Sequence, residues 1–242
     1  MRHSKCVFVL TTLAVLILAS SVGAQNPLIQ RGLDMLGPGS GGLTQAEMSE
    51  GLKEALRVGT DAVVSRLGVP GGFSLDEAVH IPIPGQLRKV QKALQAVGQA
   101  GLADDLESKM NQAAEQATPR AKALFMQAIQ TMTIQDVSQI LNGPDDAATS
   151  YFRRSMAPEL AKEMQPVVGQ AMAESGAVQA YDTMMGRYEK LPFVPDVKTD
   201  LNGYVVEKCL DGIFHYVAVE EAAIRKDPAR RTTDLLRKVF GK

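Results

Sequence analysis

The chain has 242 residues, of which 45% are hydrophobic and 22% are charged, a composition typical of a folded protein with a hydrophobic core. Its 26 Lys and Arg residues nearly balance 27 Asp and Glu residues, which gives a net charge of −1. Because nucleic acids and anionic membranes attract strongly basic surfaces, this balance gives no electrostatic reason to expect either as a partner.

Residues 1–24 have the regions of a secretory signal peptide. Arg2 and Lys5 are positive, 7–19 are apolar, and small residues precede a predicted cleavage site before Gln25. The apolar part is too short for a mature transmembrane helix, and no later stretch suffices. We therefore expect an exported protein, periplasmic if its bacterial host has an outer membrane. The alternative is an uncleaved N-terminal anchor.

The predicted signal peptide determines which cysteine remains in the mature protein. Cys6 would leave with the signal peptide, and Cys209 would remain alone, so no internal disulfide is expected. A buried apolar role is the favoured interpretation of Cys209. No cysteine stands at the cleavage point, which argues against a lipid-anchored lipoprotein.

Residues 25–42 are expected to form a flexible tether, because they end in the glycine-rich run 37–42. This run formally matches the G-x-G-x-x-G pattern of dinucleotide-binding sites. Such a site requires a preceding strand and a surrounding βαβ unit, and the sequence predicts neither. No cofactor is therefore expected.

Apolar residues recur every three to four positions through most of 43–242, which is the period of an amphipathic helix. The first helix is predicted to begin at a capping box of Thr44 and Glu47 and to end at Gly68. Further helices are predicted over 87–97, 102–117, 119–132, 134–141, 147–156, 158–172, 178–188, 201–224 and 228–240. The predicted fold is all-α: a single compact multi-helix domain of about ten helices.

Three local patterns between these helices give further expectations. Ser74 and Glu77 have capping-box spacing and predict a short helix. Prolines make 79–84 extended, with His80 interpreted as partly exposed on a rigid connector rather than as a ligand or base. Thr118-Pro119 has the favoured arrangement of a helix start.

The stretch 142–154 combines a helix exit, a helix start with two acids, and two arginines. Asp145 is predicted to cap the helix that follows, and Asp146 to add negative charge at the positive end of its dipole. One interpretation is a polar site in which the acids hold a metal or the arginines hold an anion. The other is a capped helix whose arginines, including Arg153, pair with carboxylates elsewhere.

A second charged group lies near the C-terminus. Glu221 falls on the apolar face of the predicted helix 201–224, and Arg225 follows one turn later as its natural partner. The candidate polar site combines both groups: Asp145, Asp146, Arg153, Glu220, Glu221, Arg225 and Arg231. No residue is predicted to be catalytic, and no metal site is predicted.

The familiar catalytic signatures are missing from the sequence: G-x-S-x-G, H-E-x-x-H, C-x-x-C and the P-loop. Asp211 and His215 lie one helical turn apart and could hold a metal, but no third ligand is evident. The pair is therefore interpreted as part of a helix surface, and the sequence leans against an enzyme.

Several short motifs occur together along the chain: Gly51–Leu56, Ile81–Pro84, Asp145–Thr149 with Tyr151–Arg153, Leu191–Phe193, Asp211–Gly212 before Phe214, Glu220–Glu221, Ile224–Arg225 and Arg231–Leu236. In these motifs the chain resembles the bacterial family catalogued as domain of unknown function 4197, over roughly 44–241. The resemblance implies a bacterial exported protein and supplies no activity, ligand or catalytic residues. Cys209 and His215 depart from what the resemblance implies, so neither is a candidate for a shared function.

Three functions remain open at this point. The favoured hypothesis is a non-catalytic envelope protein that binds a partner protein or small ligand through a helical surface. The second is an enzyme or a ligand- or metal-binding protein that uses the carboxylate–arginine site. The third is a structural helical scaffold without a pocket. No sustained heptad repeat predicts a coiled coil, so the sequence leaves the oligomeric state undetermined.

Overall fold

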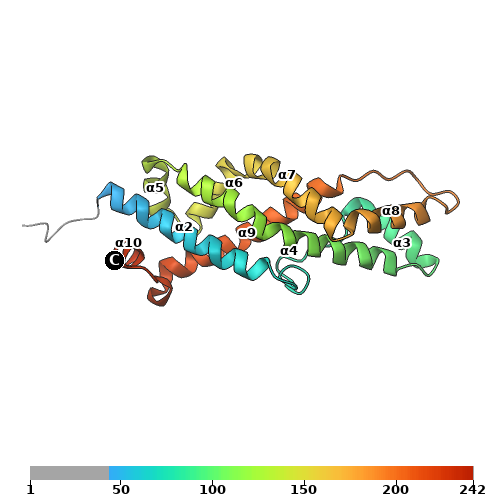
Figure 1. Ribbon diagram of the computed structural model, residues 1–242, viewed down its shortest axis with the longest axis horizontal. Helices are drawn as coiled ribbons and strands as arrows, with labels where there is room; N and C mark the ends of the chain where they lie inside the picture. Colours follow the sequence, from blue (N-terminus) through green and yellow to red (C-terminus); the bar gives the residue numbers. More distant parts are fainter. Residues whose placement is uncertain (1–43, 242) are drawn as a thin grey trace, which may run out of the picture. The chain divides into compact units, whose positions relative to one another are not determined.

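The computed structural model describes residues 44–241, which form nine α-helices and two short 3₁₀ helices (Figure 1). The elements are α2 (Gln45–Leu67), η1 (Gly85–Leu87), α3 (Arg88–Ala96), α4 (Gly101–Gln130), α5 (Ile134–Leu141), α6 (Ala147–Ser155), α7 (Ala157–Glu174), α8 (Ala177–Tyr188), α9 (Leu201–Lys226), η2 (Pro228–Arg230) and α10 (Asp234–Phe240). This part of the chain has no strand, which confirms the all-α prediction. None of its helices is long and apolar enough to cross a membrane. The predicted signal peptide and tether lie outside the described residues.

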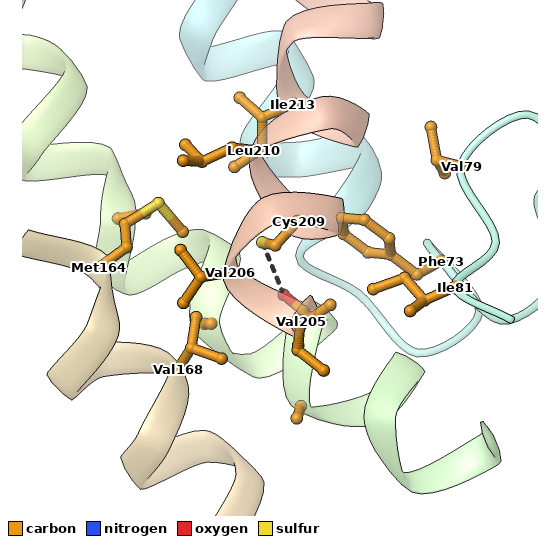
Figure 2. Packing of buried hydrophobic residues seen from close by; sticks show 14 of the residues in the cluster. Phe73, Val79, Ile81, Met164, Val168, Val205, Val206, Cys209, Leu210 and Ile213 are labelled. Atoms are coloured by element: carbon orange, nitrogen blue, oxygen red, sulfur yellow. Dashed lines mark hydrogen bonds between the residues drawn. The ribbon is translucent and has the colours of Figure 1, made fainter. Parts of the chain in front are cut away.

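The two longest helices, α4 and α9, carry most of the core. Helix α4 packs against α2, α7 and α8, and α9 packs against α2, α6 and α7. Fully buried alanines on α4 let the neighbouring helices approach closely: Ala103, Ala113, Ala114, Ala117 and Ala121. Figure 2 shows where Phe73 and Ile81, from the connector between α2 and α3, lie near Cys209 of α9. The connector, residues 68–84, thus contributes several buried apolar side chains to the core.

Two helices begin as the sequence predicts. Thr44 and Glu47 form the capping box at the start of α2, which ends before Gly68. Thr133 opens α5 in the same way, with Asp136 as the reciprocal partner. In both cases the donor and acceptor are three residues apart, so the local sequence contains the whole motif.

The prediction of a short helix after Ser74 is wrong, because residues 70–75 and 77–79 form turns. The backbone N–H and the hydroxyl of Ser74 both donate to Glu115 Oε1 of α4, at 3.0 and 2.9 Å. A distant carboxylate therefore replaces the local cap. The predicted extended segment 79–84 is confirmed over 81–84, where no helix or turn forms before η1, but it is wrong at Val79, which belongs to a turn.

The predicted helix boundary at Thr118-Pro119 is also wrong, since α4 runs without interruption through Pro119. Proline has no N–H to donate to the carbonyl four residues earlier. Thr118 is fully buried, and its hydroxyl donates to Ala114 O at 2.8 Å instead of capping a new helix. The Pro119 ring lies against Gly68, where an added Cβ would stand 2.7 Å from Pro119 Cγ. Packing against the end of α2 thus accommodates a proline that would otherwise end the helix.

Gly68→Ala should lower the free energy of unfolding by about 1–3 kcal/mol, because the new methyl group would overlap the Pro119 ring. Gly186→Ala is the matched control: this glycine lies inside α8, and nothing lies within 4 Å of an added Cβ. That variant should gain about 0.5–1 kcal/mol. Urea unfolding measures both changes. The same methyl group would stand 2.7 Å from Val64 O, so an unchanged midpoint for Gly68→Ala would mean that both the ring and this carbonyl move aside without cost.

Helix α10 packs against α2 and completes a small second apolar cluster of Ala55, Ile224 and Leu236. Gly51 allows this contact, because a Cβ at this position would overlap the side chain of Val239. The segment 51–56 and the segment 231–236 therefore meet at one interface. Gly51, in the first of these segments, therefore has a packing role.

Candidate functional site

The charged residues predicted to form a polar site come from four places in the fold. Asp145 and Asp146 precede α6, Arg153 lies in α6, Glu220, Glu221 and Arg225 lie in α9, and Arg231 follows η2. Of these, Glu221, Arg225 and Arg231 form one connected group. The other four make separate contacts at the surface.

Glu221 caps helix α6 from the distant helix α9. Its Oε1 accepts the N–H of Ala148 at 2.9 Å, and its Oε2 accepts the N–H and hydroxyl of Thr149, each at 3.0 Å. The first N–H groups of a helix have no partner within the helix, and this end of the dipole favours negative charge. The cap predicted from Asp145 is wrong, and Asp146, which holds the N-cap position, makes no side-chain capping bond.

Arg225 and Arg231 extend this group to two helix ends. Arg225 Nη2 lies 3.0 Å from Glu221 Oε1, as the spacing predicts, and also donates to Ile140 O of α5 at 2.9 Å. Arg231 donates to Ile224 O at 3.1 Å and to Arg225 O at 2.8 Å. The carbonyls at the end of a helix lack partners within it, and these arginines supply them. The three charged side chains thus join the ends of α5, α6 and α9.

This group leaves little room for a ligand. The side chains of Glu221 and Arg225 are 6% and 12% exposed. The adjoining cavity has a volume of about 10 Å³ and is lined mainly by apolar side chains of α2, α9 and α10. Since a single water needs roughly 10–15 Å³, the cavity holds at most one. The geometry is that of a structural junction.

The remaining predicted residues contact single partners near the surface. Asp145 Oδ2 pairs with Lys226 Nζ at 2.5 Å, and Glu220 Oε1 lies 3.7 Å from Arg230 Nη2. Asp146 accepts a long hydrogen bond, 3.4 Å, from the Ser150 hydroxyl. Exposed pairs of this kind contribute about 0–1 kcal/mol each to stability.

Arg153 lies beside an open groove. Its Nη1 is 3.1 Å from Asp211 Oδ1, and its guanidinium lies 5.2 Å from the Phe214 ring centroid. Lys208 Nζ also contacts Asp211, at 3.3 Å. Arg153, Asp211 and Phe214 line a groove of about 290 Å³ between α7 and α9. Asp211 is therefore engaged by two cations, whereas His215, its predicted neighbour, is exposed.

A row of polar side chains on α4, absent from the sequence prediction, holds the connector. Asn111 is fully buried: its side-chain oxygen accepts from Ile81 N and its amide donates to Ile81 O, both at 2.9 Å. Glu107 accepts from Ile83 N at 2.8 Å and lies 3.0 Å from His80 Nε2. With Glu115, these residues are spaced four apart and face the connector.

This row had a signal in the sequence. Residues 79–84 cannot form a helix because of their prolines, so their buried backbone groups need partners elsewhere. Acid and amide side chains spaced four apart on the following helix are suitable partners. His80 is partly exposed on the connector, as predicted, and in addition pairs with Glu107.

A second polar cluster fastens the connector to α2 and α9. Tyr216 donates to Asp76 Oδ2 at 2.6 Å, Arg66 donates to the same oxygen at 3.0 Å, and Arg66 lies 4.0 Å from the Tyr216 ring centroid. The hydrogen bonds from Tyr216 and Arg66 hold the pKa of Asp76 below its usual value. Burial, followed by the bond to Asp76, raises the pKa of Tyr216. At neutral pH, Asp76 is therefore ionised and Tyr216 remains a neutral hydrogen-bond donor.

Cys209 lies in the core, where burial raises the pKa of its thiol to about 12 (Figure 2). The thiolate is the reactive form, so both low access and low ionisation should protect it. Peptide mapping after iodoacetamide treatment at pH 8 should find Cys209 unmodified in the folded protein and fully modified in urea. Modification of the folded protein at the rate of an exposed thiol would contradict this burial.

Comparison with known proteins gives one match. A family model described as "Protein of unknown function (DUF4197)" matches residues 42–241. No curated protein and no solved structure matches the chain. Within residues 44–241, no group of three or more His, Cys, Asp and Glu side chains is placed to hold a metal ion.

Proposed function

The chain belongs to the family described as protein of unknown function (DUF4197), and from this premise we propose that it is a non-catalytic helical module of the bacterial envelope. Its function would be to bind a partner protein or a small ligand. The observation that carries the proposal is the internal pairing of Glu221, Arg225 and Arg231 with helix ends. Charged side chains that bind helix ends inside the domain stabilise the fold. The exposed helix surfaces, rather than these side chains, are then available for binding.

Export is part of the proposal and rests on the sequence of residues 1–24. Expression in the native host, followed by fractionation and intact mass measurement, tests it. The expected product lies in the envelope fraction and begins at Gln25. A product that keeps Met1 in the cytoplasm would contradict export, and one that keeps it in the membrane would indicate the N-terminal anchor.

A second candidate is a small anionic ligand bound in the groove beside Arg153. This groove is open, about 290 Å³ in volume, and places a half-exposed guanidinium over an aromatic ring. Arginine binds carboxylate and phosphate groups through paired hydrogen bonds. An entering anion would displace Asp211 from Arg153.

Native mass spectrometry of the chain purified from its host envelope distinguishes these functions. Co-purification at a fixed ratio with one identified protein supports the favoured function. A small added mass that disappears in Arg153→Ala supports the second. Arg120→Ala is the matched control, because Arg120 forms a comparably exposed pair with Glu174 outside the groove. Unliganded protein without any partner would contradict both and favour a structural scaffold.

A further inference from the structure

Glu115 of α4 is a buried carboxylate whose two oxygens have different surroundings. The residue is 6% exposed, and its Oε1 accepts the N–H of Phe73 at 3.1 Å. The same oxygen accepts the N–H and the hydroxyl of Ser74, at 3.0 and 2.9 Å. No hydrogen bond reaches Oε2 from residues 44–241. A carboxylate has about four acceptor sites on its two oxygens, so holding the connector accounts for Oε1 and leaves Oε2 without a role.

This second oxygen is accessible from outside the core. Among the described residues, the fully buried side-chain atoms without a hydrogen-bond partner are Thr199 Oγ1 and Asn202 Oδ1. Glu115 Oε2 also lacks a partner in that part of the chain, but it is not one of these sealed atoms. Glu115 lines a groove of about 340 Å³ between α4 and the connector. Its Oε2 is therefore reached through this groove.

The Glu115 groove is formed by residues 68–71 and Ser74 of the connector and by Gln112, Glu115 and Gln116 of α4. Val69 and Pro70 are exposed and give the groove an apolar edge. The two glutamines bring side-chain amide oxygens to the same groove. A polar floor with an acidic group thus lies beside a short apolar edge.

The charge of the groove is negative. Among the described residues that line it, Glu115 is the one charged group. Arg66 and Arg120 lie nearby along the chain, but each pairs with another carboxylate. Lys109 does not line the groove and forms no ion pair with Glu115 within residues 44–241. A buried charge without a counter-charge is costly, so the groove favours a cation from outside.

The donors already bound to Glu115 decide which kind of cation fits. A guanidinium binds a carboxylate best through both oxygens, and Oε1 already accepts three hydrogen bonds. A calcium ion takes about six to eight oxygen ligands, usually with several carboxylates. Within residues 44–241, no group of three or more His, Cys, Asp and Glu side chains is placed to supply them. An ammonium group is a compact charge with three donors, which suits a single available carboxylate oxygen.

We propose that the Glu115 groove binds a primary alkylammonium group, which lysine side chains and small amines carry. The ammonium would donate to Glu115 Oε2 and to the side-chain oxygens of Gln112 and Gln116. Its alkyl stem would lie along Val69 and Pro70, as the stems of lysines lie on apolar surfaces. This site adds a ligand class to the proposed binding function and shares no lining residue with the Arg153 groove.

Titration of the purified, ¹⁵N-labelled chain with n-butylammonium chloride tests the site by NMR. The amide signals of Phe73 and Ser74 should shift and saturate, because both N–H groups donate to the carboxylate that binds the amine. n-Butanol is the uncharged control and should leave these signals in place. Failure of the amine to give a saturable shift, or equal shifts with both compounds, would overturn the proposal.

A second probe, Nα-acetyl-lysine N-methylamide, distinguishes the two sources of the ammonium group. Tighter binding than that of n-butylammonium assigns the groove to a lysine side chain of a partner. Equal or weaker binding assigns it to a small amine. Shifts of the same signals with calcium chloride but with neither amine would overturn the proposal in favour of a metal ion.

Glu115→Gln removes the charge while preserving the structural contact. The side-chain oxygen that remains can still accept from Phe73 and Ser74, and an amide NH₂ replaces Oε2. The dissociation constant for n-butylammonium should rise at least about tenfold, as expected for a lost hydrogen bond to a charged group. Glu107→Gln is the matched control, because Glu107 belongs to the same row on α4 but lies outside the groove. Equal affinities of Glu115→Gln and the unchanged chain would contradict the site.

Gln112→Lys tests the site without altering Glu115. It places an ammonium group three residues before the carboxylate, where helix neighbours meet, so it should abolish binding of the amine. Gln127→Lys adds the same charge at an exposed position of α4 outside the groove and should bind normally. Undiminished binding by Gln112→Lys would overturn the proposal even if Glu115→Gln fails to fold.

This test is separate from that of the proposed function. If no amine binds, the Glu115 groove is excluded as a site, and co-purification of the chain with a partner protein remains an independent result. If an amine binds but the chain purifies alone, the groove stands and the partner-binding function fails.

Discussion

Replacing Glu221 with alanine is expected to lower the free energy of unfolding by about 3–5 kcal/mol, because it leaves a buried arginine without its counter-charge. The substitution removes the partner of Arg225, and it removes the carboxylate that accepts three hydrogen bonds from Ala148 and Thr149 at the start of α6. Urea unfolding monitored by circular dichroism measures the change. The loss should exceed that of any single surface ion pair in the domain.

Glu220→Ala is the control, since Glu220 is the adjacent carboxylate and pairs with Arg230 at the longer distance of 3.7 Å. It should change stability by less than about 1 kcal/mol. Similar losses for the two variants would indicate that the Glu221 group contributes no more than a surface pair. A large loss only at Glu221 supports its role as the cap of α6.

Asn111→Leu should have a comparable effect through a different cause. Leucine preserves most of the side-chain volume but leaves the N–H and C=O of Ile81 without partners in the core. Each buried unsatisfied group costs about 1–3 kcal/mol, so the expected loss is about 2–6 kcal/mol. Chemical denaturation gives this value.

Gln112→Leu provides the comparison for Asn111. Gln112 is the next residue on α4, and its side chain makes one exposed bond, to Ser108, at 3.3 Å. Its replacement should change stability by less than about 0.5 kcal/mol. If Asn111→Leu behaved like Gln112→Leu, the connector would not depend on α4 for its backbone hydrogen bonds.

The fold class could be predicted because helix periodicity and local caps are contained in short stretches of sequence. The capping box predicted at Thr44 is present, and Thr133, before the predicted helix 134–141, forms another; each joins residues three apart. The errors at Ser74 and Thr118 share one cause. Each hydroxyl was predicted to cap the start of a helix, but in the structure it donates to another oxygen, Glu115 Oε1 for Ser74 and Ala114 O for Thr118. Burial by distant helices decided these cases, and a local pattern does not contain that information.

The candidate site was predictable to a similar extent. Glu221 on an apolar face with Arg225 one turn later is a local pattern, and the pair forms at 3.0 Å. Its contact with Thr149, 72 residues away, depends on how α6 meets α9. The sequence identified the buried acid but assigned its capping role to Asp145. Whether any of these residues also binds a ligand stays a prediction.

The polar row on α4 has a consequence for the order of folding. Glu107, Asn111 and Glu115 face one side only when α4 is already helical. The connector contacts made by these residues span 24 to 42 positions in sequence. Closing such loops costs conformational entropy before the new contacts contribute any stabilising free energy. The connector should therefore order late, after α4 has formed, and its native contacts should be largely absent from the folding transition state.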